Sequence, residues 1–194
     1  MMRALAFAFA MSVSSSALAQ AGPGEEIDLL PPPKPPSPAE AARARKLEEE
    51  LLERRSLLQI HQGLGFALLG AMATTTVLGQ LEYADKYGGG GDTGKWHASH
   101  QIASYATAGI FAGAGLVALL APAPTARPGR VDTAVLHRIA MAIATAGMVA
   151  QIALGIASAR SEGRLAQRDY AVAHQITGYA TVAATATGFV VLAF

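Results

Sequence analysis

Four apolar segments of bilayer-spanning length constrain this 194-residue chain more than any other feature. A helix needs about 20 residues, at about 1.5 Å of rise each, to cross a hydrocarbon core about 30 Å thick. Arg138 is the single Asp, Glu, Lys or Arg residue inside the four segments. The pattern predicts an all-α, membrane-spanning four-helix bundle over residues 57–194. The predicted spans are residues 57–81, 98–121, 133–157 and 170–194.

The composition agrees with a membrane protein that binds no nucleic acid. Hydrophobic residues make up 52% of the chain and charged residues 15%, and the mean hydropathy is +0.31. Soluble domains contain about 25% charged residues. The net charge is +1, without a basic cluster that has interleaved aromatic residues. Cysteine is absent, which excludes disulfides, thiolate metal sites and covalent c-type haem attachment.

Three shorter segments precede the first predicted span. Residues 1–19 combine Arg3, an apolar run and a small-residue ending, which is the pattern of a signal peptide cleaved before Gln20. Residues 20–38 are rich in proline and predict an extended periplasmic tether. Residues 39–56 lack Gly and Pro and predict a polar helix that leads into the membrane. Signal cleavage predicts a bacterial-type inner membrane protein whose mature N-terminus is periplasmic.

Each apolar segment carries one histidine near its start. Ionisable groups inside a membrane are rare and are functional candidates by default. Because successive spans alternate in direction, the first and third histidines are predicted on the periplasmic side and the other two on the cytoplasmic side. The four candidates are His61, His100, His137 and His174.

An internal repeat relates the two halves of the bundle. The sequence HQIASYAT at residues 100–107 recurs as HQITGYAT at residues 174–181. The first and third histidines are 76 residues apart (137 − 61), and the second and fourth are 74 apart (174 − 100). The spacing predicts a duplicated helical hairpin, which places two equivalent histidines opposite each other on each side of the membrane. Two imidazoles on facing helices suit a bis-axial site for haem iron.

The helix faces below the histidines consist largely of small residues. Positions three, four and seven after a histidine share its face. Leu78-Gly79 also stands at the same offset from His61 as Leu154-Gly155 does from His137. Close helix packing in lipid explains small faces by itself, but below four matched histidines they favour a macrocycle. The small faces are Ala103, Ser104 and Thr107; Ala140, Met141 and Ala144; and Thr177, Gly178 and Thr181.

The order and approximate spacing of these histidines over residues 57–194 resemble the transmembrane cytochrome b-561 family. The resemblance implies two non-covalent b-type haems, one ligated by His61 and His137 and the other by His100 and His174. It also implies electron transfer across the bilayer in support of a membrane oxidoreductase. The chain departs from the family by lacking its additional outer helices. The donor and acceptor, for which a quinol or a small reductant is a candidate, and a homodimeric state stay open.

Two other functions are alternatives to the cytochrome. One is a histidine-lined metal or proton transporter, which the lack of a carboxylate in the predicted spans disfavours. The other is a haem-free membrane anchor for a periplasmic partner.

Some residue assignments also have alternatives. His97 lies three residues before His100 on the same face and competes with it as a ligand, but Ala171 holds the equivalent position in the repeat. Basic residues near the histidines are candidates for binding haem propionates, with interfacial anchoring as the alternative role. They are Arg54, Arg55 and Arg138 on the periplasmic side and Lys95, Arg164 and Arg168 on the cytoplasmic side.

Overall fold

The computed structural model describes residues 35–122 and 132–193. These residues form four helices, each long and apolar enough to cross a membrane. The predicted all-α class and the four predicted spans are therefore confirmed. The predicted signal peptide (residues 1–19) and most of the predicted tether (20–38) lie outside the described residues. The helices are α1 (Pro38–Tyr87), α2 (His97–Leu120), α3 (Thr133–Arg160) and α4 (Ala166–Ala193).

Helix α1 is 50 residues long, because the predicted polar helix and the first span are continuous. Its start is a capping box. The Glu40 backbone N–H donates to Ser37 Oγ at 3.3 Å, and the Ser37 N–H donates to Glu40 Oε2 at 2.7 Å. Pro38 occupies the first helical position, where its missing N–H removes no helical hydrogen bond. The helix therefore begins one residue before the predicted boundary at residue 39.

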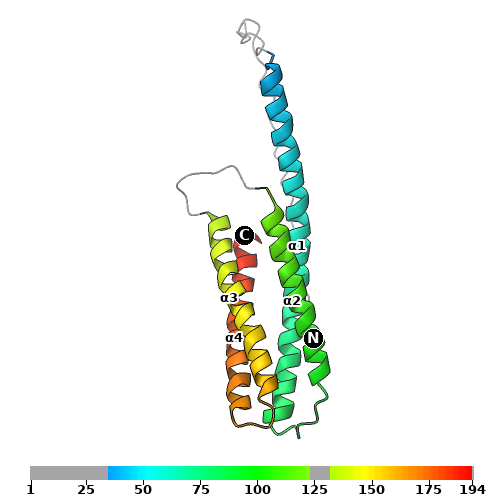
Figure 1. The fold of residues 1–194 in the computed structure, drawn as a ribbon, viewed down its shortest axis with the longest axis vertical. Coiled ribbons are helices and arrows are strands. Elements are labelled where there is room, and N and C mark those ends of the chain that lie inside the picture. The colour runs from blue at the N-terminus through cyan, green and yellow to red at the C-terminus, as the bar shows by residue number, and fades with distance from the viewer. Residues whose placement is uncertain (1–34, 123–131, 194) are drawn as a thin grey trace, which may run out of the picture. The chain divides into compact units, whose positions relative to one another are not determined.

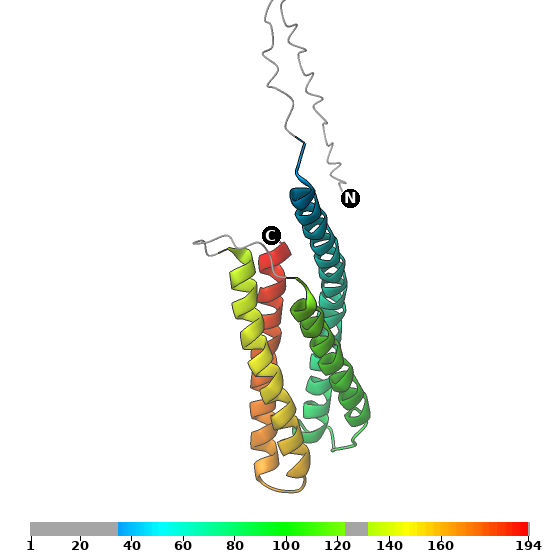
Figure 2. The same ribbon diagram turned by 45° about the horizontal axis from the view of Figure 1, so that its top comes forward.

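Within residues 42–193, α1 lies beside α2 and α3 lies beside α4 (Figures 1 and 2). Each pair is antiparallel, and both pairs turn at the same end of the bundle. The α1–α2 connection contains Gly89, Gly91 and Gly94, all at positive φ, which glycine adopts without strain. The Asp85 carboxylate holds this connection by accepting bonds from Thr93 Oγ1 at 3.0 Å and the Gly94 N–H at 2.9 Å.

The buried interior follows the histidine-bearing face of each helix. The residue seven positions after each histidine is at most 5% exposed. Thr107 also bonds across its hairpin, with its hydroxyl 2.8 Å from that of Thr75. On the outer surface, Ile102 and Tyr105 are 69% and 70% exposed, which is the apolar exterior that a bilayer would cover. The four buried residues at the seventh position are Leu68, Thr107, Ala144 and Thr181.

Candidate functional site

The structure brings the four histidine rings together in two pairs. The ring centres of His61 on α1 and His137 on α3 are 6.0 Å apart, with the ring planes at 90°. The ring centres of His100 on α2 and His174 on α4 are 6.3 Å apart, with the planes at 85°. We call these the first and the second histidine pair. They are the two pairs that the internal repeat predicts.

Every ring in the two pairs is held in the same way. Its Nδ1 lies within hydrogen-bond distance of a backbone carbonyl on the other helix of its hairpin. A carbonyl oxygen can only accept, so Nδ1 carries the proton. In a neutral imidazole the free lone pair is then on Nε2, the nitrogen available to a metal. The bonds run from His61 to Ala114 (3.0 Å), from His100 to Thr75 (3.1 Å), from His137 to Gly188 (2.7 Å) and from His174 to Gln151 (3.0 Å).

The four accepting carbonyls occupy equivalent places on their helices. Each belongs to the residue fourteen positions after the histidine of its own helix, since 75 − 61, 114 − 100, 151 − 137 and 188 − 174 all equal 14. Fourteen residues make nearly four helical turns and span about 21 Å along the axis. Each helix therefore carries its own histidine at one level and supports the ring of its hairpin partner at another level about 21 Å away. The two histidine pairs are separated by that distance along the helices.

Two glycines leave space for the imidazole rings of the second pair. A Cβ atom built on Gly79 would lie 2.8 Å from Cε1 of His100, and one built on Gly155 would lie 3.3 Å from Cε1 of His174. Each glycine is eighteen residues after the histidine of its own helix (79 − 61 and 155 − 137). The repeated Leu-Gly pair of the sequence thus marks where α1 and α3 contact the imidazoles of the second pair.

His97 lies outside the second pair. Its side chain is 61% exposed, and its Nδ1 is 2.6 Å from Glu82 Oε1. His97 is the first residue of α2, whereas His100 lies one turn further in and faces His174. The geometry therefore favours His100 over His97 as the member of the pair.

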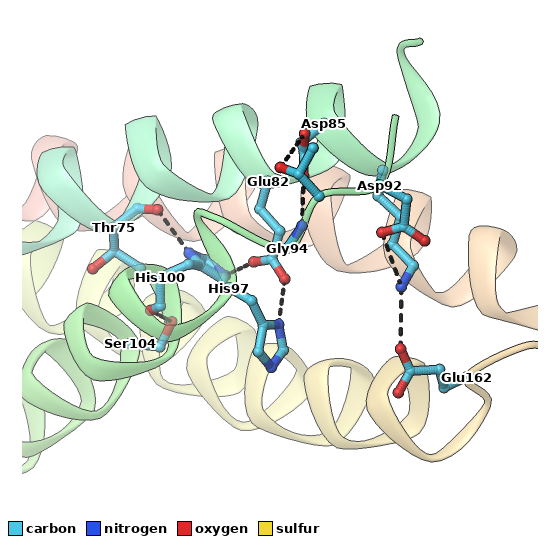
Figure 3. A network of polar contacts seen from close by, with 11 residues as sticks. Thr75, Glu82, Asp85, Asp92, Gly94, His97, His100, Ser104 and Glu162 are labelled. Atoms are coloured by element: carbon cyan, nitrogen blue, oxygen red, sulfur yellow. Dashed lines mark hydrogen bonds and ion pairs between the residues drawn. The ribbon is translucent and has the colours of Figure 1, made fainter. Parts of the chain in front are cut away.

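Glu82 is a site residue that the sequence analysis missed. Its Oε2 lies 4.0 Å from His100 Nε2, while its other oxygen contacts His97 (Figure 3). Glu82 lies one residue beyond the predicted first span. The four predicted spans therefore contain no carboxylate, although helix α1, which is longer than the first span, contains this one. Glu82 is 21 residues after His61 (82 − 61), close to six turns, so it continues the same helix face. Extending that face along α1 would have found it.

Three of the six basic residues considered for propionate binding contact other groups in this structure. Arg54 Nη1 donates to the Pro122 carbonyl at 2.5 Å. Arg138 is exposed, and its Nε donates to the Ala134 carbonyl at 3.3 Å. Lys95 Nζ lies 5.3 Å from the centre of the Trp96 ring. Arg54 lies seven residues before His61 (61 − 54), on the same helix face, so it is the basic residue best aligned with the first pair.

The spacing within both pairs fits one metal ion between two imidazoles. Metal–imidazole bonds are about 2 Å long and a ring nitrogen lies about 1 Å from its ring centre, so two rings that share a metal in line have centres about 6 Å apart. Among residues 35–122 and 132–193, no group of three or more His, Cys, Asp or Glu side chains is placed to hold a metal ion. Two imidazoles are the number of protein ligands that a metal needs when a macrocycle fills its other positions.

Comparison with known proteins finds no family model, no curated protein and no solved structure that matches this chain. Its function is therefore inferred from the geometry of the two pairs.

Proposed function

We propose that this chain is a membrane b-type cytochrome that holds one haem at each histidine pair and carries electrons across the bilayer. The observation that supports this most is the shared geometry of the pairs. Their ring centres are 6.0 and 6.3 Å apart. All four Nδ1 atoms are engaged by carbonyls, which leaves four Nε2 lone pairs as ligands.

The residues of the chain would bind, orient and isolate the group. The carbonyl bonds select the tautomer that presents Nε2 and raise its basicity as a ligand. Small buried residues such as Ala144 and Thr181 let the helices approach closely below the rings. A haem held by both histidines of a pair would supply a one-electron ferric–ferrous couple and would leave no place for oxygen to bind. Electron transfer therefore suits these sites better than oxygen activation.

The proposal also covers the origin of the bundle and the segments that precede α1. We infer that the bundle arose as a duplicated helical hairpin, and that its four histidines correspond to those of the cytochrome b-561 family. Support comes from the matching places of the accepting carbonyls, of the buried seventh residues and of Gly79 and Gly155. From the sequence of residues 1–38 we propose a cleaved signal peptide, a Pro-rich tether and a periplasmic N-terminus in an inner membrane.

A transporter of bare metal ions fits these pairs less well. Structural zinc sites use four protein ligands and catalytic sites use three, whereas each pair offers two imidazoles. Glu82 supplies a carboxylate beside the second pair, but no equivalent residue occupies the matching place on α3. That place is Ser158, 21 residues after His137 (158 − 137). The metal ligands common to both pairs are therefore the two imidazoles alone.

The test is haem content and its loss in single variants. Purified protein should contain about two non-covalent b haems per chain and show low-spin reduced spectra. His61→Ala and His137→Ala should each remove the haem of the first pair, and His100→Ala and His174→Ala the haem of the second. His97→Ala is the matched control and should keep both.

Several results would contradict this assignment. A reproducible content of one haem per chain in fully loaded protein would exclude two haem sites. If His97→Ala loses a haem and His100→Ala keeps both, the ligand on α2 is His97 and not His100. A colourless protein without extractable haem would favour the transporter or the anchor.

A further inference from the structure

The two histidine pairs differ in the charges that surround them. Near the first pair, the ionisable residues closest in sequence are basic, because Arg55 precedes His61 and Arg138 follows His137. Near the second pair, Lys95 and Asp169 stand five residues before His100 and His174, and the Glu82 carboxylate lies 4.0 Å from His100 Nε2. The sequence repeat that makes the imidazoles equivalent thus does not extend to the charges.

Glu82 is the carboxylate that the described structure places against a histidine ring of the second pair (Figure 3). Three other acidic groups at this end of the bundle have partners of their own. Asp85 binds Thr93 and the backbone of the α1–α2 connection. Asp92 and Glu162 pair with Lys86 Nζ at 3.8 and 3.4 Å.

The position of Glu82 is restricted on two sides. Its side chain is 25% exposed, and its Oε1 is 2.6 Å from Nδ1 of His97. That contact holds one oxygen at the start of α2 and leaves the other directed toward His100. A single carboxylate therefore links the exposed histidine to the paired one.

We propose that Glu82 makes the second histidine pair the site of lower reduction potential. The inference rests on the proposed binding of haem at both pairs. A nearby negative charge favours the ferric form, which carries one more positive charge than the ferrous form. Near a membrane interior this interaction is less screened than in water. Glu82 therefore shifts the electron, at equilibrium, toward the haem held by His61 and His137.

Redox titration of the purified, haem-loaded protein tests this assignment. The parent should show two midpoint potentials, and in His174→Ala the lower one should be missing. Glu82→Gln should raise the lower potential toward the upper one and leave the upper one unchanged. Glu162→Gln is the matched control, because it makes the same charge change at the same end of the bundle on a side chain that is 76% exposed. It should leave both potentials unchanged.

Haem content, measured first, separates the two proposals. A chain without two haems overturns the proposed function and this inference together. Two haems with both potentials unmoved, or moved equally, in Glu82→Gln overturn the role of Glu82 alone. If Glu82→Gln loses the haem of the second pair, Glu82→Ala, which removes the carboxylate and leaves no polar group in its place, decides. It should raise the lower potential, and an unmoved lower potential overturns the proposal.

Discussion

At the scale of single residues, the Nδ1 atoms of the four imidazoles are held by main-chain carbonyls and not by side chains. Carboxylates often orient metal-binding histidines, but here the acceptors are the backbones of Thr75, Ala114, Gln151 and Gly188. A backbone acceptor cannot be removed by changing a side chain. The tautomer of each ring therefore depends on the register between the two helices of its hairpin.

The contact between Gly79 and the His100 ring can be tested with a single substitution. In Gly79→Ala the new methyl group would lie 2.8 Å from His100 Cε1, so the ring must move. Such overpacking costs about 1–3 kcal/mol. We expect the haem of the second pair to be lost or spectrally altered and that of the first pair to stay, as measured by haem content and reduced spectra.

Gly70→Ala is the control for this variant. Gly70 lies on the same helix, and a Cβ built there meets nothing within 4 Å. It should therefore keep both haems. If the two variants lose the same amount of haem, contact with the His100 ring does not explain the role of Gly79.

At the scale of helices, two residues of α1 join the hairpins through contacts with α4. The rings of Phe66 and Phe189 have their centres 4.9 Å apart. Gln80 Oε1 accepts from Gln175 Nε2 at 2.6 Å and from the Tyr179 hydroxyl at 2.5 Å. In lipid, helix association depends on packing and on interhelical hydrogen bonds because apolar burial provides little driving force. Gln80 is therefore a link between the hairpins and not only a polar residue in a span.

Gln80→Leu removes both of these bonds while keeping a side chain of similar size. Interhelical hydrogen bonds in membranes contribute about 0.6 kcal/mol each, so we expect a loss of about 1 kcal/mol in stability. Denaturation in detergent, followed by helical circular dichroism, measures the loss. Gln101→Leu, at an exposed position of α2, is the control and should change stability less. Equal effects of the two variants would argue against the link.

At the scale of the whole molecule, the fold carries two similar sites at different depths. The accepting carbonyls place the two histidine pairs about 21 Å apart along the helices. In the proposed cytochrome this arrangement assigns one site to each half of the bilayer. Because each helix contributes to both levels, displacement of one helix should affect both sites.

The segment before α1 is expected to act independently of the bundle. Residues 20–36 are polar and rich in proline, a composition that cannot form a packed core. Their deletion, with the Ser37 cap retained, should leave both haem spectra and potentials nearly unchanged. Reduction by a periplasmic donor should slow, while dithionite still reduces both haems. Loss of haem on deletion would show instead that the segment belongs to the folded core.

Features that depend on local properties could be predicted from the order of residues along the chain. Length and apolarity predict the four spans, and the structure confirms them as helices. The repeat predicts which rings meet, because equivalent positions on related hairpins lie at equivalent depths. Such features need only the spacing of residues along one helix.

The support of the rings and their surroundings depend on contacts between helices. The acceptor of each Nδ1 lies on another helix, and so do the contacts of Gly79 and Glu82 with His100. The same holds for the position of His97 outside the second pair. These contacts depend on how far each helix is rotated about its axis and shifted along its neighbour. Rotation and shift are set by side-chain packing between helices, which the order of residues along one helix does not reveal.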